Sequence, residues 1–315
     1  MIETLRARRR IAPYTRRTPL VRSSWLSDSS GGDVWLKLES LQVTNSFKAR
    51  GAFNAVIERL ERRERMPRPL VTASAGNHGR ALAAAAETFG LPLVVFTPAG
   101  APAAKLDAIR RHGADLRAEA QDYDAAERAA KAFARDAGAE FISPYSDRNV
   151  IDGAGTVALE LIEDVPDLET IVVPIGGGGL ISGVAEVAKA INPRVEVVGV
   201  ELEVSHVFLA SLREGRLVEI VAGESLADGL GGNADPETIT FALIQRFVDR
   251  IVTVSEDDLA AALGGLVERE HLITEGAGCA ATAAVLSGRA DISGRRTAII
   301  VSGSNIDRAR LAALL

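Results

Sequence analysis

Short apolar runs alternate with longer helical stretches along the whole chain of 315 residues, and this alternation constrains the fold most strongly. Runs such as TIVVPI at Thr170–Ile175 and VEVVGVE at Val195–Glu201 are almost continuously apolar, as expected of parallel strands covered by helices on both faces. The sequence therefore predicts an α/β protein with mostly parallel sheets. The predicted strands are Val34–Leu38, Leu70–Ala73, Leu93–Thr97, Ala114–Arg117, Thr170–Ile175, Val195–Glu201, Arg250–Val254 and Thr297–Ser302. The predicted helices are Lys48–Arg63, His78–Phe89, Ala101–His112, Tyr123–Ala137, Gly155–Glu163, Leu180–Ile191 and Asp257–His271, after an amphipathic first helix.

Composition excludes several classes of protein. A net charge of −6 argues against nucleic acid or an anionic membrane surface as the main partner. No apolar run approaches the ~20 residues that a membrane-spanning helix needs. A single cysteine, Cys279, excludes an intramolecular disulfide and is typical of a reducing compartment. Because the first residues lack the apolar core of a secretory signal, we expect a cytoplasmic protein.

Two strand–turn–helix units have unusual turns: LVTASAGNHGRALA at Leu70–Ala83 and IVVPIGGGGLISG at Ile171–Gly183. Their separation along the chain suggests one unit in each of two domains, with a cleft between them. We expect a large domain of residues 1–66 and 148–315 and a small domain of residues 67–147.

Gly176 to Gly179 lie between a predicted buried strand and a helix that begins near Leu180. Glycine permits positive φ and close approach to a ligand, and amides at a helix N-terminus attract anions. The run therefore predicts an anion site, such as one for a phosphate. Its spacing matches neither the P-loop nor GxGxxG, although Glu201, about twenty residues downstream, could bind the ribose of a dinucleotide. A nucleotide-dependent dehydrogenase therefore stays an alternative.

Lysine is rare here, with five lysines against 31 arginines, so each lysine can be considered singly. We expect Lys37, Lys105, Lys131 and Lys189 to be solvated, because they lie on predicted strand faces or amphipathic helices. Lys48 differs, because it follows a polar turn at a predicted helix start. A positive helix end and partial burial both favour a neutral amine, as a Schiff-base lysine requires.

Two further segments carry polar groups where open α/β sheets bind ligands. The SAGNHG turn at Ser74–Gly79 offers amides and the Asn77 side chain to a carboxylate. A tight turn in which His78 is only a helix cap is the alternative. The VSGSNID segment at Val301–Asp307 places Ser302 at the end of the last predicted strand.

Together these segments make the chain resemble, nearly end to end, the pyridoxal-phosphate enzymes of fold type II, the tryptophan-synthase-β fold. The resemblance is to the branch of threonine and serine dehydratases and serine racemase. It implies two three-layer α/β/α domains with mostly parallel sheets, pyridoxal 5'-phosphate in the cleft between them, and a homodimer. The motifs that carry it are RTPL at Arg17–Leu20, KLESLQVTNSFKARGA at Lys37–Ala52, SAGNHG, GAGT at Gly153–Thr156, GGGG, LADGLGG at Leu226–Gly232 and SGSN at Ser302–Asn305.

The resemblance also implies roles for individual residues. Lys48 would bind the cofactor covalently and later move the α-proton of the substrate. The glycine run would hold the phosphate, Asn77 the ring hydroxyl and Ser302 the ring nitrogen. The residues expected at the cofactor are Phe47, Lys48, Asn77, Gly176, Gly177, Gly178, Gly179, Leu180 and Ser302. The residues expected at the substrate carboxylate are Ser74, Ala75, Gly76, Asn77 and His78.

The implied reaction is α,β-elimination of water from a β-hydroxy amino acid, followed by release of ammonia. A hydroxyl such as that of Ser302 need not keep the ring nitrogen protonated, which weakens the ring as an electron sink and favours loss of the β-hydroxyl. L-threonine and L-serine, giving 2-oxobutanoate and pyruvate, are the expected substrates. Phenylserine and hydroxyaspartate stay open, and Tyr145 and Leu230–Asn233 are candidates for the side-chain pocket.

Three departures from the family pattern refine this expectation. Racemases of the branch have serine where this chain has Ala75, so racemisation should be minor. Members with a divalent cation have a second acid six residues after the first, whereas here Glu201 is matched by Val207, and we expect no such metal site. Because the chain ends at Leu315, we expect no regulatory domain and no inhibition by isoleucine. The histidines without ligand spacing are expected to be structural: His112, His206 and His271.

Other functions remain open at this point. Serine racemase and β-replacement of the cysteine-synthase type are the alternatives within the same family. A nucleotide-dependent dehydrogenase and a cofactor-free amino-acid-binding protein are the alternatives outside it.

Overall fold

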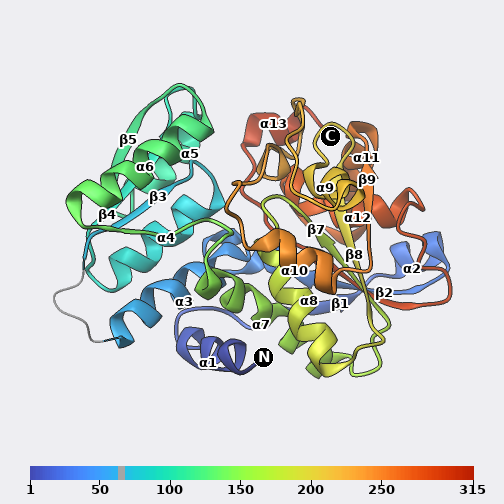
Figure 1. Cartoon of the computed structure of the whole chain (residues 1–315). Helices are drawn as coiled ribbons and strands as arrows, with labels where there is room; N and C mark the ends of the chain where they lie inside the picture. The colour runs from blue at the N-terminus through green and yellow to red at the C-terminus, as the bar shows by residue number, and fades with distance from the viewer. Residues whose placement is uncertain (63–67) are drawn as a thin grey trace.

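A computed structural model describes residues 1–62 and 68–315 of the chain (Figure 1). It contains a six-stranded sheet and a four-stranded sheet, which lie side by side in the view of Figure 1. Every strand pairing within them is parallel except that of the first two strands. This confirms the predicted α/β class with mostly parallel sheets. Arg63 and the domain boundary predicted between residues 66 and 67 lie outside the described residues.

The six-stranded sheet has helices on both faces. Val172 packs into the core on one face, whereas its neighbours Ile171 and Val173 pack into the core on the other. This alternation, with both sets apolar, explains the continuous hydrophobic run of this strand. The strand order is β1 (Leu20–Arg22), β2 (Asp33–Leu38), β10 (Arg296–Val301), β7 (Thr170–Pro174), β8 (Glu196–Leu202) and β9 (Arg250–Val254). One core involves α2 (Ser24–Ser30), α11 (Glu256–Glu270) and α12 (Gly276–Leu286); the other involves α7 (Arg148–Asp164), α8 (Gly179–Ile191), α9 (Val207–Glu214) and α10 (Thr240–Phe247).

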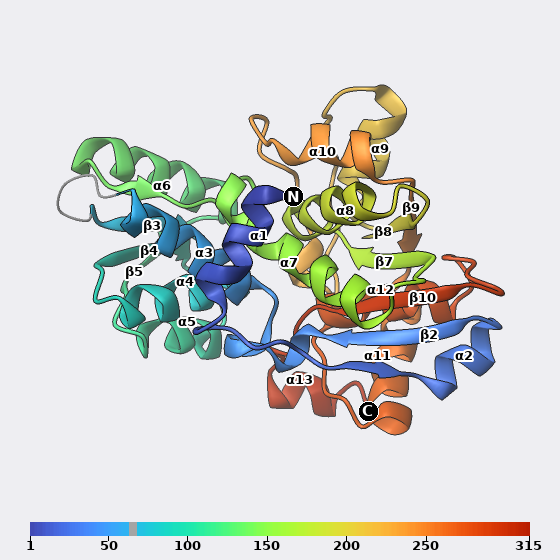
Figure 2. The same cartoon turned by 90° about the horizontal axis from the view of Figure 1, so that it is seen from below.

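The four-stranded sheet is also covered on both faces. Its order is β5 (Asp115–Ala120), β4 (Leu93–Pro98), β3 (Leu70–Ala73) and β6 (Glu140–Phe141). One core involves α3 (Lys48–Glu61), α4 (Asn77–Thr88) and α5 (Ala103–Arg110), and the other involves α6 (Tyr123–Ala137). Helix α1 (Ile2–Ile11) packs on α3 and α7, and α13 (Arg308–Ala312) ends the chain (Figure 2). The described residues also contain three short 3-10 segments: Glu39–Leu41, Val43–Asn45 and Asp228–Leu230.

The predicted strands and helices are all present, and most of their ends differ only slightly from the structure. The largest difference is α7, which begins at Arg148 rather than Gly155, because the Asp147 side chain accepts hydrogen bonds from the amides of Asn149 and Val150. The last strand ends at Val301, one residue before Ser302. The elements without a sequence prediction are β1, β6, α2, α9, α10, α12 and α13. No helix in the described part of the chain is long and apolar enough to span a bilayer.

Helix α7 contacts α3 and α8 almost backbone to backbone. A Cβ atom at Gly153 would lie 2.4 Å from the carbonyl oxygen of Arg50, and one at Gly183 would lie 2.3 Å from that of Ile151. Side chains at these crossings would force the helices apart. The first glycine of the GAGT motif therefore sets the distance between α7 and the helix that begins at Lys48.

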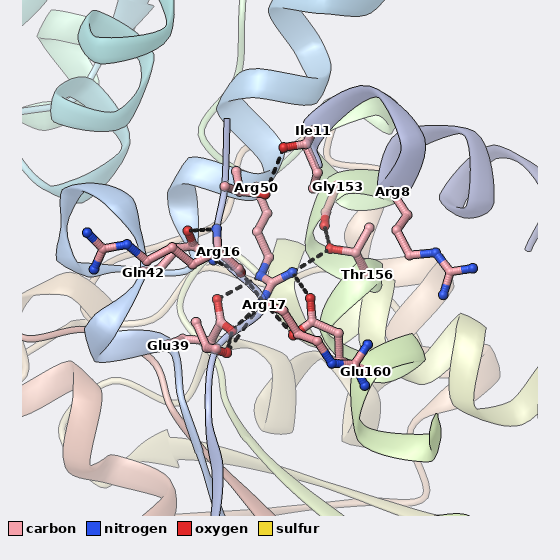
Figure 3. A network of polar contacts seen from close by, with 12 residues as sticks. Arg8, Ile11, Arg16, Arg17, Glu39, Gln42, Arg50, Gly153, Thr156 and Glu160 are labelled. Carbon is pink, nitrogen blue, oxygen red and sulfur yellow. Dashed lines mark hydrogen bonds and ion pairs between the residues drawn. The ribbon is translucent and has the colours of Figure 1, made fainter. Parts of the chain in front are cut away.

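Four charged side chains are buried where β2, α3 and α7 meet: Lys37, Glu39, Arg50 and Glu160. Figure 3 shows Glu39, Arg50 and Glu160. Arg50 donates to Glu39 Oε2 through Nε at 2.8 Å and to Glu160 Oε1 through Nη1 at 2.6 Å. Lys37 Nζ donates to Glu160 Oε2 at 2.6 Å and to the carbonyl oxygen of Thr18 at 2.7 Å. Burial opposes ionisation of Glu160, but the hydrogen bonds from Arg50 and Lys37 prevail and lower its pKa. The two cations and two carboxylates thus compensate one another.

The expectation that Lys37 is solvated is therefore wrong, because its side chain is fully buried. The strand pattern could not reveal this, since Glu160, its partner, lies 123 positions away in the sequence.

We predict that Glu160→Gln lowers the free energy of unfolding by about 3–5 kcal/mol, because it leaves Lys37 and Arg50 to share one carboxylate in the interior. Glu163→Gln on the same helix is the matched control. Glu163 also pairs with two arginines, but its side chain is 46% exposed. We expect this control to cost less than about 1 kcal/mol. Urea unfolding of both variants measures the difference, and equal midpoints would contradict a stabilising role for the buried cluster.

Candidate active site

One cavity of about 590 Å³ lies between the two sheets, at the carboxyl ends of β3, β7 and β10. It is lined by every residue that the sequence analysis assigned to a cofactor or to the substrate carboxylate: Phe47, Lys48, Ser74, Ala75, Gly76, Asn77, His78, Gly176, Gly177, Gly178, Gly179, Leu180 and Ser302. The structure thus brings both unusual turns and the last strand to one place. The individual roles of these residues stay predictions.

Lys48 is the first residue of α3, and its amine lies in the wall of the cavity. Burial lowers the pKa of this amine to about 8, while the negative charge of Glu275 acts in the opposite direction. Nζ donates a hydrogen bond to the carbonyl oxygen of Pro144 at 2.7 Å and lies 5.1 Å from the centre of the Phe47 ring. A carbonyl stabilises an ammonium less than a carboxylate does. Lys48 is therefore more easily deprotonated than an ordinary lysine.

The other lysines all pair with carboxylates. Besides the buried pair of Lys37 described above, Lys105 pairs with Asp228, Lys131 with Glu127 and Asp235, and Lys189 with Asp249. Lys105, Lys131 and Lys189 are partly exposed rather than freely solvated, and Lys105 lies at the cavity.

The glycine loop joins β7 to α8, with Gly178 in the left-handed region at φ +85°. Within residues 1–62 and 68–315, the amides of Gly176, Gly177, Gly178, Gly179 and Leu180 donate to no protein acceptor. Unpaired amides at a helix N-terminus form a site for an anion. The loop is therefore a group of donors that face a cavity and have no partner in the protein.

The SAGNHG turn joins β3 to α4 in a similar way. Ser74 Oγ accepts a hydrogen bond from the amide of Gly76 at 3.2 Å, which closes the turn. Among the described residues, the amides of Ala75, Asn77 and His78 donate to no protein acceptor. Burial and the nearby charge of Lys48 lower the pKa of His78 to about 3, so its imidazole is neutral at neutral pH. An anion here would be held by main-chain amides rather than by a histidine cation.

Ser302 follows β10 and also lines the cavity. Its Oγ donates to the carbonyl oxygen of Ala277 at 3.2 Å. The described residues place no carboxylate within hydrogen-bond distance of this hydroxyl.

Tyr145 and Leu230–Asn233, the candidates for the side-chain pocket, also line the cavity. The phenol oxygen of Tyr145 accepts a hydrogen bond from the amide of Asp235 at 2.9 Å, and burial raises the pKa of this phenol. A Cβ atom at Gly177 would lie 2.3 Å from the Tyr145 ring. Tyr145 therefore connects the glycine loop to the segment that contains Asp235. The Asn233 amide is likewise engaged, because it bonds to both main-chain polar groups of Ile220.

Glu275 is a cavity residue that the sequence analysis missed. It immediately precedes α12, whose side chains are buried almost all round, so no amphipathic pattern marks the helix. Burial raises the pKa of the Glu275 carboxyl to about 7. The signal in the sequence, a single acid in TEGAG, is too short to be specific.

Glu201 does not project into this cavity. Its carboxylate accepts hydrogen bonds from the amides of Phe208 and Leu209 at 2.9 and 2.8 Å, at the start of α9. This contact removes the basis for a ribose-binding role in a dehydrogenase. The described residues contain no group of three or more His, Cys, Asp and Glu side chains arranged to hold a metal ion.

Solved structures similar to this chain share the whole architecture. Maize serine racemase superposes with a TM-score of 0.91 at 33% identity, over 99% of this chain and 95% of that one. A threonine deaminase from T.th. superposes with a TM-score of 0.89 at 35% identity, over 98% of both chains.

The alignments with sequence relatives cover nearly the whole of this chain. L-threonine ammonia-lyase of Thermotoga maritima is 43% identical over 301 residues, which span 96% of this chain and 74% of that protein. The catabolic L-threonine dehydratase of Escherichia coli strain K12 is 37% identical over 311 residues, 98% of this chain and 94% of that protein.

The family described as pyridoxal-phosphate dependent enzyme matches residues 11–303. That span includes all three segments that meet at the cavity. The resemblance inferred from the motifs is confirmed, and the chain belongs to the pyridoxal-phosphate-dependent enzymes of fold type II.

Proposed function

We propose that the chain is a pyridoxal-phosphate-dependent ammonia-lyase acting on L-threonine and L-serine. It would form 2-oxobutanoate from threonine, pyruvate from serine, and ammonia from both. The observation that carries this proposal is that Lys48, the glycine loop, the SAGNHG turn and Ser302 all line the same cavity. The names of the relatives, threonine ammonia-lyase and threonine dehydratase, support the same reaction.

The residues of the cavity suit pyridoxal phosphate. Unpaired amides of the glycine loop match its phosphate, and the Lys48 amine, hydrogen-bonded to the carbonyl of Pro144, matches its aldehyde. Asn77 and Ser302 supply neutral groups for the ring hydroxyl and the ring nitrogen, and Phe47 would pack beside the ring.

Bound pyridoxal phosphate withdraws electrons from Cα of an amino acid, which weakens the Cα–H bond. The protein has to fix the carboxylate and move protons. The amides of Ala75, Asn77 and His78 would hold the carboxylate, and Lys48 would accept the Cα proton, since its pKa is already lowered to about 8. The overall reaction converts threonine into 2-oxobutanoate and ammonia, because the water lost from Cβ is regained when the amino group leaves.

Serine racemase is the second candidate, since maize serine racemase has the same fold. Racemisation requires a proton donor on the face of Cα away from Lys48. Ala75 lines the cavity at the position where racemases of this branch have serine, and a methyl group donates no proton. This residue favours elimination over racemisation.

We further propose that the enzyme works as a homodimer in the cytoplasm. The family resemblance supports the dimer. The single cysteine, Cys279, is buried, and the absence of other cysteines supports a reducing compartment.

Lys48→Ala should abolish the visible absorption band of the bound cofactor and the formation of 2-oxobutanoate, because Lys105, the other lysine at the cavity, is ion-paired with Asp228. Lys189→Ala is the control, since Lys189 pairs with Asp249 and does not line the cavity. It should keep both signals, while circular dichroism shows that both variants are folded. A Lys48→Ala enzyme that kept covalently bound cofactor would refute the assignment.

Gly178→Val should weaken cofactor binding to the apoenzyme by about 5–150-fold, equivalent to ~1–3 kcal/mol. Gly178 has φ +85°, and a Cβ atom there would lie 2.8 Å from Ile244 Cδ1. Gly138→Val is the control, because Gly138 has φ +62° with no atom within 4 Å of its Cβ position. Gly138→Val should lower the stability of the protein but leave its affinity for pyridoxal phosphate unchanged. Fluorescence titration of each apoenzyme with pyridoxal phosphate measures that affinity. Equal affinity in the two variants would mean that the glycine loop is only a turn.

Ala75→Ser should increase the share of D-serine among the products from L-serine, because it adds a hydroxyl donor to the wall that carries the substrate-binding amides. A positioned acid is worth roughly 10²–10⁴-fold in rate, so a rise of at least about tenfold is expected while pyruvate formation persists. Ala75→Gly changes the volume without adding a donor and should produce no increase. Chiral chromatography measures the products, and a wild-type enzyme that forms D-serine as fast as pyruvate would contradict the proposal.

A further inference from the structure

Glu275 is an ionisable side chain of the cavity to which the proposed reaction gives no role. It lies just before α12, and its amide donates to the carbonyl oxygen of Gly303 at 3.2 Å. A Cβ atom at Gly303 would lie 2.1 Å from Glu275 Oε1. The glycine of the SGSN motif thus makes room for this carboxyl group.

A chain of hydrogen bonds leads from Glu275 to the guanidinium group of Arg80. Asn77 Nδ2 donates to Glu275 Oε1 at 2.5 Å, and Asn305 Nδ2 donates to Asn77 Oδ1 at 2.7 Å. Arg80 Nη1 in turn donates to Asn305 Oδ1 at 2.5 Å, and Asn305 Nδ2 also donates to the carbonyl oxygen of Thr44 at 2.9 Å. The chain connects α4, beside the four-stranded sheet, to the segments after β10 and before α12.

These bonds fix which way the Asn77 amide points. Its oxygen is held by a donor, Asn305, and its nitrogen by an acceptor, Glu275. A primary amide nitrogen carries two N–H bonds, so one remains for a ligand after Glu275 has accepted the other. A carboxylate acceptor strengthens such a bond, and hydrogen bonds in a chain polarise one another.

We propose that Glu275 is a positioning residue that, together with Arg80 and Asn305, holds the Asn77 amide with its free N–H directed to the cofactor ring. This inference rests on the proposed function, since it concerns the site of pyridoxal phosphate. In this arrangement Asn305 of the SGSN motif holds the oxygen of the Asn77 amide, and Arg80, which follows the SAGNHG turn, holds Asn305.

Glu275 also sets the electrostatic surroundings of Lys48, because its negative charge raises the pKa of that amine. The charged groups that act on Glu275 are Asp228 in the 3-10 segment Asp228–Leu230, Lys105 on α5 and Arg80 on α4. His78 is the other titratable group that is coupled to Lys48, and it is neutral near pH 7. Replacing the carboxylate by a neutral group that still accepts a hydrogen bond should therefore lower the pKa of Lys48.

The test compares Glu275→Ala with Glu275→Gln. The alanine variant removes the acceptor, so the apoenzyme should bind pyridoxal phosphate about tenfold more weakly, with a shifted absorption maximum. The glutamine variant can still accept from Asn77 and should bind within about threefold of wild type. In this variant the pH midpoint for covalent attachment of the cofactor, followed by stopped-flow absorbance, should fall. Glu256→Ala, which removes a carboxylate bonded to Ser225 outside the cavity, should change none of these readouts.

Asn305→Asp provides a second, independent variant. An aspartate there cannot donate to Asn77 Oδ1, so the Asn77 amide would turn around and the affinity should fall as in Glu275→Ala. The inference is overturned if Glu275→Ala and Asn305→Asp bind the cofactor as wild type does, or if alanine and glutamine at position 275 behave alike. A wild-type enzyme with no covalent cofactor band would instead overturn the proposed function, so the two failures are distinguishable.

Discussion

The buried cluster of Lys37, Glu39, Arg50 and Glu160 is the interaction on which the arrangement of this molecule depends. A charge that loses its partner in the interior is costly, so β2, α3 and α7 are constrained to keep one mutual register. Arg50 lies two residues after Lys48, near the start of α3. The cluster therefore fixes the helix turn that presents the amine to the cavity, although none of its side chains reaches that cavity.

The cavity itself is formed largely by main-chain groups. Amides of the glycine loop and of the SAGNHG turn face it, and the carbonyl of Pro144 holds Lys48. Main-chain groups at the ends of strands are placed by the sheet. Tyr145 adds a side-chain contact to this arrangement, because its ring packs on Gly177 and its hydroxyl accepts a hydrogen bond from the amide of Asp235.

The sequence was sufficient where the relevant signal is local. Continuous apolar runs predicted the strands. Turns with glycine, asparagine or serine after those strands predicted three segments that line one cavity: the glycine loop, the SAGNHG turn and the segment that begins at Ser302. It was insufficient where a partner is distant in the chain: the burial of Lys37 depends on Glu160, and the place of Glu275 depends on Asn77. Helix α12 was missed for a related reason, since a helix buried on all sides has no polar face to give it a period.

The pairing of the lysines has a consequence for chemical selectivity. An amine that is held in an ion pair with a carboxylate is less available to attack an aldehyde, and a guanidinium is a poor nucleophile. Since Lys37, Lys105, Lys131 and Lys189 are ion-paired and arginine supplies the rest of the basic side chains, Lys48 is the side-chain amine best prepared to attack an aldehyde. A protein that must capture one aldehyde at one place thereby presents few competing amines anywhere else on its surface.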